Sequence, residues 1–374
     1  MPDTPAPTPA WLNDAWSKTV KKTAYSVRRA RELDEIPYTT KDGGWHSLGP
    51  SWWTNGFWPA LMWQMAIGTG DALYREEAER GERLLDRALE RFEDLHHDLG
   101  FQFKISSAVN YALTKNPKSL RRATLAANLL AGRFNPNGFI RAWNGERIGW
   151  SIIDSMMNLP MLYWASRESS DPRFRLIAER HADHTARHFI RPDASCHHIV
   201  IFDPVSDAVL DTPRGQGYAP GTSWTRGQAW ALYGFTLSHL WTGKPEYLDV
   251  ARRVADRFLE RITPDWIPNI DFEQPDQPYG KDNAAGAIAA CGLLELAALI
   301  PDRTDAYRDG ALNMLRAMAD ECADWDEADP GILKQCTGSY TEKDSWHIKM
   351  VYGDYFFVEA LLKLKGSSVN LWLI

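Results

Sequence analysis

Two aspartates in apolar surroundings are the side chains of this sequence best suited to acid–base chemistry. Asp154 lies in Ser-Ile-Ile-Asp-Ser-Met-Met-Asn-Leu-Pro, residues 151–160, and Asp98 lies in His-His-Asp-Leu-Gly-Phe, residues 96–101. Both segments are expected to begin buried helices. Burying a carboxylate is unfavourable unless it is paired, hydrogen-bonded or protonated, and active sites use this effect to shift pKa values. We therefore predict that Asp98 and Asp154 form a catalytic pair.

Each aspartate also has a structural interpretation. Asp98 could be the N-cap of a helix, because an aspartate at that position accepts backbone N–H bonds. The same role fits Asp154 less well, since the apolar residues Met156, Met157 and Leu159 follow it where a surface helix would expose polar ones. A helix N-terminus favours the Asp154 anion, whereas apolar neighbours and a second carboxyl favour the acid. Only the second effect would leave a proton to donate.

Aromatic side chains are the compositional outlier. The chain has 17 tryptophans in 374 residues, including Trp52, Trp53, Trp224 and Trp230 in two clusters. A single tryptophan is usually a core anchor, but as a set they offer flat faces on which sugar rings can stack. Arg226 lies between Trp224 and Trp230 in the sequence. A cation between indoles suits a sugar that carries a carboxylate, although it could also stack for packing alone.

Helical patterns recur in pairs along the chain and must position these side chains. In each pair the first helix is apolar nearly all round, as in helices buried on every side, and the second carries charges on one face. The expected first helices are 56–67, 152–166, 227–240 and 283–299, and the expected second helices include 72–93 and 245–262. An opening helix near 13–33 and a closing one near 353–364 bring the total to about twelve, as in a repeat architecture.

This repeat predicts an all-α fold, an (α/α)6 barrel built from six helical hairpins. A single catalytic domain would span residues 1–374, with residues 1–10 as a disordered N-terminal tail. An open solenoid is the alternative, but the polar capping helices that it needs are not evident. Residues 191–226 interrupt the helical pattern with a β-branched run at 198–202 and several Gly and Pro residues. Long loops in compact domains usually carry function, so substrate contacts are expected there.

Charge and targeting features exclude several classes of protein. The net charge of -7 provides neither a basic footprint for nucleic acid nor a polybasic membrane surface. No apolar run approaches the roughly 20 residues of a membrane span, and the N-terminus has no apolar leader, so a cytoplasmic location is expected. The four cysteines follow no CxxC spacing, which agrees with a reducing compartment.

No cofactor and no metal are expected. The sequence has no phosphate loop, dinucleotide fingerprint or serine nucleophile elbow. His181, His184 and His188 have the spacing of metal ligands on one helix face, but charged residues surround them, so we interpret the segment as an outer helix with a solvated face. His197 and His198 open the irregular stretch and could be either site residues or packed structural histidines.

Motifs spread over nearly the whole chain resemble the unsaturated glucuronyl hydrolases, glycoside hydrolase family 88. They are, in order, residues 96–101, 152–154 with 158–160, 223–230, 271–273 and 352–355. The resemblance implies an (α/α)6 barrel. It also implies that the substrate is an oligosaccharide left by a polysaccharide lyase, with a 4,5-unsaturated uronic acid at its non-reducing end. A monomer or homodimer is expected.

The resemblance assigns roles to individual positions. Asp154 would protonate C4 of the vinyl ether and take a proton from the water that adds at C5, after which the hemiketal opens and expels the remaining sugar chain. Asp98 would bind ring hydroxyls and stabilise the transition state. Substrate contacts would come from polar and aromatic residues at the mouth of the barrel: Trp53, His97, His198, Gln216, Trp224, Arg226, Trp230 and Tyr340.

Three positions depart from the family pattern. Asn55 stands where Asp is expected, Thr341 where His is common, and Cys336 where small hydroxyl residues are frequent. They leave open whether the polysaccharide is a glycosaminoglycan, gellan, xanthan or ulvan, and whether sulfate is tolerated.

Other functions remain as alternatives. They are an unsaturated rhamnogalacturonyl hydrolase, a sugar epimerase with two histidines at the mouth, and a non-catalytic sugar-binding protein. An epimerase fits His197 and His198 poorly, because adjacent residues of an extended chain point to opposite faces.

Overall fold

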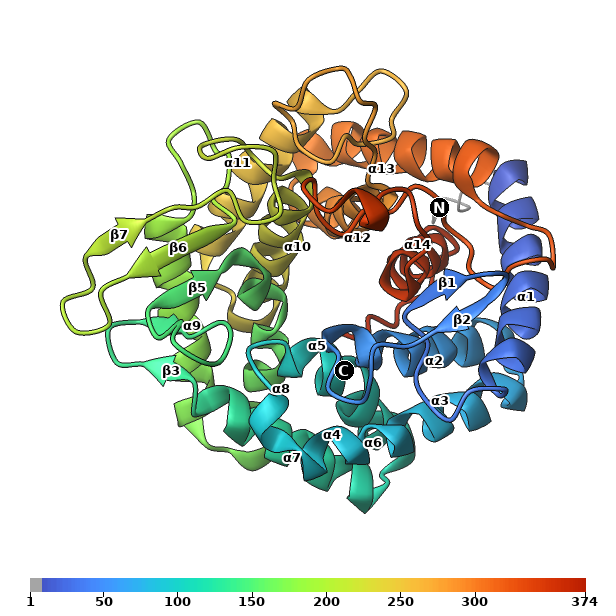
Figure 1. The fold of residues 1–374 in the computed structure, drawn as a ribbon, viewed down its shortest axis with the longest axis horizontal. Helices are drawn as coiled ribbons and strands as arrows, with labels where there is room; N and C mark the ends of the chain where they lie inside the picture. The colour runs from blue at the N-terminus through green and yellow to red at the C-terminus, as the bar shows by residue number, and fades with distance from the viewer. Residues whose placement is uncertain (1–8) are drawn as a thin grey trace, which may run out of the picture.

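Two concentric rings of helices build the protein. The computed structural model describes residues 9–374, and Figure 1 looks along the axis of the rings, around which the chain passes in order. The inner ring consists of α2 (Phe57–Thr69), α5 (Leu99–Phe103) continued by α6 (Val109–Thr114), α8 (Leu159–Ser169), α10 (Thr225–Thr242), α12 (Asn283–Leu299) and α14 (Val351–Leu364). The outer ring consists of α1 (Ala10–Ala30), α3 (Ala72–Leu84), α7 (Pro117–Ala131), α9 (Pro172–His188), α11 (Pro245–Arg261) and α13 (Thr304–Ala317).

The inner ring is closed. Each inner helix contacts the next, and α14 contacts α2. The contact of α2 with the second inner helix is made by the turn Lys104–Ala108, which joins α5 to α6. This closure confirms the predicted (α/α)6 barrel and excludes the open solenoid.

The two rings differ in burial as their sequences predict. α12 is buried around its whole circumference from Asn283 to Leu293. α11 instead buries the one face that a period of 3.6 residues brings together. That face consists of Tyr247, Val250, Ala251, Val254, Ala255 and Phe258. The outer helices α7, α9 and α11 begin with Pro, whose missing N–H is tolerated in the first turn of a helix.

Two predicted helices are wrong in extent, while most others agree within three residues. Residues 152–166 do not form one helix: β5 (Trp150–Ile152) and a 3₁₀ turn (Ile153–Met157) precede α8. Ile152 pairs with Ile199, the first residue of β6 (Ile199–Phe202), and Ile153 N donates to His198 O. The backbone of residues 152 and 153 is therefore not helical. Residues 72–93 divide into α3, a short α4 (Asp86–Glu90) and a final turn.

Three small antiparallel sheets accompany the helices. They pair β1 (Thr39–Lys41) with β2 (Gly44–His46), β3 (Phe134–Asn135) with β4 (Phe139–Ile140), and β5 with β6 and β7 (Val209–Asp211). β6 is the β-branched run within the predicted irregular region. In its register Ile199 lies opposite Ile152, and Ile201 lies opposite Trp150.

The histidines of α9 correct another prediction. His181 and His184 are fully buried and His188 is half-buried, so this face of the helix is not solvated. It packs against β4, where Ile140 N donates a 3.0 Å hydrogen bond to His181 Nδ1. The charges that suggested an outer helix lie on its other face.

The N-terminal tail predicted for residues 1–10 falls largely outside the described residues, which begin at 9, and Ala10 is already the first residue of α1. Across residues 9–374, no helix has both the length and the apolar character needed to cross a membrane.

Candidate active site

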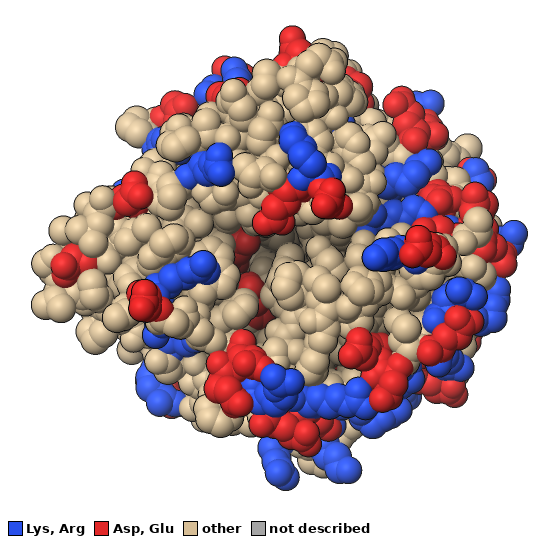
Figure 2. Space-filling view, viewed as in Figure 1, with Lys and Arg blue, Asp and Glu red and all other residues tan. Residues whose placement is uncertain are grey.

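The N-terminal ends of the inner helices meet at one end of the barrel. Because an outer helix running back joins each inner helix to the next, the inner helices share one direction, and side chains at their first residues converge. Asp98 directly precedes α5, Asp154 lies in the turn before α8, Arg226 is the second residue of α10, and Asp282 caps α12. Figure 2 shows the molecule hollowed near its centre along this axis, with acidic side chains visible at depth.

Strand pairing sets Asp154 opposite His198. Ile153 N donates to His198 O at 3.0 Å, which extends the pairing of β5 with β6 by one residue. His198 Nε2 then lies 3.8 Å from Asp154 Oδ1, and neither atom has a hydrogen-bond partner among residues 9–374. Gln216 N donates to His198 Nδ1 at 2.9 Å, so a neutral imidazole carries its proton on Nε2, toward Asp154. Gly215 permits this contact, because a Cβ there would come within 1.9 Å of Nδ1.

Asn158 ties the two aspartates together. Its Nδ2 donates to Asp98 Oδ1 at 3.3 Å and to the Asp154 carbonyl at 3.2 Å, and its Oδ1 accepts from Phe101 N at 2.8 Å. Gly100 makes the close approach possible, because a Cβ there would lie 2.5 Å from Asn158 Cα. Asp98 stands at the N-cap position of α5, but its carboxylate makes no capping bond, so the capping interpretation is wrong.

Burial favours the protonated forms of both carboxyls. It raises the pKa of Asp154 to about 7, against the opposing effect of the Arg226 charge. It raises the pKa of Asp98 well above its usual value, the Asp154 carboxyl raises that pKa further, and the Asn158 hydrogen bond lowers it. Two neighbouring carboxyls disfavour each other's charge, so the pair retains a proton near neutral pH. Burial lowers the pKa of His198 to about 3, which leaves its imidazole neutral.

Arg226 is the fixed positive charge of the site. Only 2% of its surface is exposed, and its guanidinium pairs with Asp282 and donates to the backbone carbonyls of residues 337 and 338. The same group lies 4.5 Å from the centre of the Trp224 ring and 5.6 Å from that of Tyr352. The Asp282 carboxylate compensates the buried charge, and the aromatic faces orient it.

Gln216 and Tyr340 join the two long loops of the mouth. Gln216 Nε2 donates to Gly338 O at 2.8 Å, and Tyr340 N donates to Gln216 O at 2.9 Å. The Tyr340 ring lies 5.0 Å from Tyr218 and 5.2 Å from Trp346, measured between ring centres. These two predicted contacts therefore lie side by side at the rim.

The predicted tryptophans lie at different depths. Trp230 is fully buried, with its ring 5.1 Å from Phe101 and 5.6 Å from Phe356, so it packs in the core behind the site. Trp53 is half-buried, 5.5 Å from Phe101 and 5.0 Å from Tyr352. Of the two, Trp53 alone has exposed surface.

The two histidine pairs are arranged differently. His97 stacks on His96, and its Nε2 lies 3.4 Å from Asp98 Oδ1, beside the acid pair. Ligand atoms of His96, His97 and Asp98 lie within 4.8 Å of one another, as in a potential metal site.

His197 turns away from His198, and its Nδ1 lies 3.2 Å from Arg191 Nη2. No second histidine of this pair therefore faces the site, contrary to what an epimerase would need.

Sequence reasoning missed three residues. Asn158 was noted only as part of a motif, and the contacts of Asp282 and Tyr352 with Arg226 were not foreseen. Asp282 precedes the apolar helix α12 as Asp154 precedes α8, and that shared pattern could have identified it. The departure at Asn55 is structural, since its Nδ2 donates to the carbonyls of residues 49 and 50, which a carboxylate could not do.

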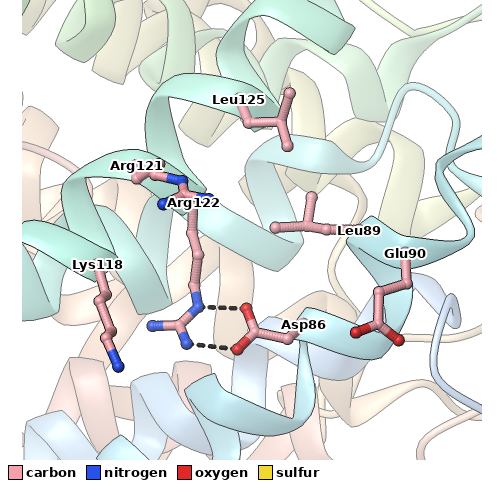
Figure 3. Close-up of a pocket in the computed structure, with 7 residues that line it drawn as sticks. All are labelled: Asp86, Leu89, Glu90, Lys118, Arg121, Arg122 and Leu125. Carbon is pink, nitrogen blue, oxygen red and sulfur yellow. Dashed lines mark hydrogen bonds and ion pairs between the residues drawn. The ribbon is translucent and has the colours of Figure 1, made fainter.

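A groove on the outside of the barrel is separate from this site. It lies between α4 and α7 and is lined by Asp86, Leu89, Glu90, Lys118, Arg121, Arg122 and Leu125 (Figure 3). Its Arg122 is paired with Asp86 through two hydrogen bonds, which compensate the charge. None of these residues stands at the start of an inner helix.

Known proteins share both the sequence and the fold. No protein-family model matches the chain. The chain is 34% identical over 362 residues to the unsaturated glucuronyl hydrolase of Bacillus sp. (strain GL1), covering 91% of this chain and 93% of that protein. It is 33% identical over 348 residues to the unsaturated chondroitin disaccharide hydrolase of Streptococcus pyogenes serotype M1, covering 89% and 86%.

A solved structure agrees closely with this one. The crystal structure of unsaturated glucuronyl hydrolase from Bacillus sp. GL1 matches it with a TM-score of 0.91 and 33% identity, covering 96% of this chain and 98% of that chain. Sequence and fold thus agree over nearly the whole length. The chain belongs to the unsaturated glucuronyl hydrolases, enzymes of the glycosidase type.

Proposed function

We propose that Asp154 is the acid that starts the hydration of a 4,5-unsaturated uronic acid. The observation that carries this proposal is the environment of Asp154 Oδ1, which is buried, accepts no hydrogen bond from residues 9–374 and lies 3.8 Å from the neutral His198 ring. Such surroundings favour a protonated carboxyl, and a pKa of about 7 suits a general acid that works near neutral pH.

The reaction then proceeds in three steps. Asp154 transfers its proton to C4, where the electrons of the C4=C5 bond form the new C–H bond. The positive charge left at C5 is shared with the ring oxygen, water adds there, and the proton that the water releases returns to Asp154. The hemiketal opens, and the remaining sugar chain leaves as an alcohol.

Two charged side chains would meet the charges of the substrate: Asp98 the positive charge that develops on the sugar ring, and Arg226 the carboxylate of the uronate. Asp98 accepts a hydrogen bond from Asn158 and lies 3.4 Å from a ring nitrogen of each neighbouring histidine, His96 and His97. The Asn158 hydrogen bond favours the Asp98 anion, whereas burial and the Asp154 charge oppose it. The proposed mechanism places the proton shared by the pair on Asp154, with Asp98 as the anion that faces the cation-like sugar ring. Arg226 attracts the carboxylate of the uronate, and Trp224 borders the ring.

The sugar on the leaving side would meet the rim formed by Gln216 and Tyr340. The relative from Streptococcus pyogenes is named for chondroitin disaccharide, which makes unsaturated chondroitin disaccharide the first substrate to test.

We also propose that the enzyme works in the cytoplasm. Its four cysteines are free and buried, which suits a reducing compartment.

The test follows the ultraviolet absorbance of the conjugated C4=C5 bond, which hydration removes. Wild type, Asp154→Asn and Asp249→Asn are compared on unsaturated disaccharides from chondroitin, gellan, xanthan, ulvan and rhamnogalacturonan. Asp249 is an exposed acid of α11 and serves as the control. We expect Asp154→Asn to lower kcat by about 10²–10⁴-fold, the usual contribution of a general acid, and Asp249→Asn to behave as wild type.

Two results would contradict the proposal. Wild-type rates in a folded Asp154→Asn variant would remove Asp154 from the chemistry. Turnover of the rhamnogalacturonan disaccharide alone would identify the rhamnogalacturonyl activity instead.

A further inference from the structure

Two histidines and an aspartate gather outside the candidate active site. His184 and His188 lie one turn apart on α9, and Asp207 lies in the turn between β6 and β7. His184 Nε2 is 2.9 Å from Asp207 Oδ1, and one ligand atom of each of the three residues lies within 4.8 Å of the others. A spacing of four residues places both imidazoles on the same face of the helix, while the carboxylate comes from a separate segment.

The surroundings hold this cluster in place. His184 is fully buried, and its ring lies 4.6 Å from Phe202 and 5.8 Å from Phe139. Asp207 N donates to Asp203 O at 3.0 Å within this turn, and its φ of 63° is a left-handed conformation that aspartate adopts more readily than most residues. The His188 ring lies 4.4 Å from that of His184 and makes no hydrogen bond to the part of the chain that the structure describes.

We propose that His184, His188 and Asp207 bind a zinc ion. Imidazole nitrogens and carboxylate oxygens are zinc ligands, and water can complete the tetrahedron. Zinc bond lengths place tetrahedral ligands roughly 3.3–3.5 Å apart. His184 and Asp207 are already near that separation, and the half-buried His188 completes the set by rotating its side chain. The ion replaces the hydrogen bond between His184 and Asp207.

Zinc at this position fastens α9 to the hairpin of β6 and β7. β6 begins at Ile199, directly after His198, so the ion steadies the segment that carries this histidine into the active site. The proposal rests on the cluster alone and is independent of the roles assigned to Asp98 and Asp154.

A zinc titration of the full chain, stripped of metal by dialysis against a chelator, tests the site. Binding is measured by competition with a chromophoric zinc chelator for wild type, His188→Gln, Asp207→Asn and the control His46→Gln. His46 is exposed on β2 and belongs to neither histidine cluster. Both ligand variants should fold, because His188 is only half-buried and Asn tolerates a left-handed backbone as Asp does.

We expect each ligand variant to bind one zinc fewer per chain than wild type, or to bind it at least about tenfold more weakly, whereas His46→Gln matches wild type. Zinc should also raise the Tm of wild type and His46→Gln more than that of the ligand variants. Comparing variants separates this site from any zinc held by His96, His97 and Asp98. Equal stoichiometry and affinity in wild type and both ligand variants would overturn the proposal.

Discussion

His198 Nε2 faces Asp154 Oδ1 at 3.8 Å, and neither atom bonds to any other residue that the structure describes. Gln216 N donates a hydrogen bond to His198 Nδ1, so Nε2 carries the proton of the neutral ring. The imidazole can therefore stabilise the Asp154 carboxylate after it has given up its proton, and it does not compete for that proton beforehand. This arrangement of the His198 N–H and the Asp154 carboxyl suits an acid that must lose its proton and regain it in each turnover.

The activity of the wild type should fall as the pH rises through about 7. Burial raises the pKa of Asp154 to about 7, and only the protonated carboxyl can donate to C4. The measurement is kcat/KM against pH, in which Asp154 is expected to produce a basic limb. His198 adds no limb near neutral pH, because its pKa is lowered to about 3. A profile that stays flat well above pH 7 would argue against Asp154 as the acid.

The Asp154→Asn variant should be more stable than wild type in alkaline solution. The folded-state pKa of Asp154 lies above its ordinary value, so the protonated carboxyl favours folding below about pH 4, and that contribution is lost as the pH rises through about 7. An amide does not titrate and escapes this loss. Urea unfolding of both proteins at acidic and alkaline pH measures the difference, which should grow with pH. A difference independent of pH would contradict a raised pKa.

Two substitutions of His198 should separate its two nitrogens. The amide of Gln lies nearer the position of Nε2, so His198→Gln keeps a donor that faces Asp154. The amide of Asn reaches only the position of Nδ1, so His198→Asn keeps an acceptor for the Gln216 N–H but loses the donor toward Asp154. We expect kcat/KM to fall by about 10²-fold or more in His198→Asn, a typical effect of removing one donor from a reacting group, and by less in His198→Gln. Near-equal rates of the two variants would show that the donor toward Asp154 contributes little.

Asn158→Ala should lose both stability and activity. It leaves the Phe101 N–H buried without its acceptor, which costs about 1–3 kcal/mol, and it removes the hydrogen bond that lowers the pKa of Asp98. With a higher pKa, Asp98 is charged less often and, in the proposed mechanism, stabilises the cation-like sugar less. Thermal unfolding and kcat/KM are the readouts, with Asn128→Ala on the exposed face of α7 as the control. Full activity in Asn158→Ala would show that the bridge is only structural.

Arg226→Met should destabilise the fold, because it leaves the Asp282 carboxylate buried without its counter-ion. Breaking such a pair costs about 3–5 kcal/mol. Adding Asp282→Asn removes the stranded charge and should recover part of that stability, but it should not restore the affinity for the substrate carboxylate. Urea unfolding and KM are measured for both variants. Recovery of KM in the double variant would mean that Arg226 acts only through Asp282.

Local patterns were enough to predict the barrel. An apolar helix followed by a charged-face helix identifies an inner and an outer member wherever it occurs, and α12 was predicted residue for residue. The turn before α8 was not predictable in this way. Residues 152–157 have the composition of a buried helix, but 152 and 153 pair with a segment more than 40 residues away in the sequence, and the helix begins only at Leu159.

The sequence by itself determined the architecture and indicated the residue types of the candidate site, because helix periodicity and the cost of burying a carboxylate are local properties. Only the tertiary structure decided that Asn158 bridges Asp98 to Asp154, that Asp282 balances Arg226, and that Trp230 belongs to the core. Each of these depends on segments far apart in the chain that closure of the ring brings within hydrogen-bond or packing distance. Which side chains meet, and hence that the two buried carboxyls share a proton, follows from that closure.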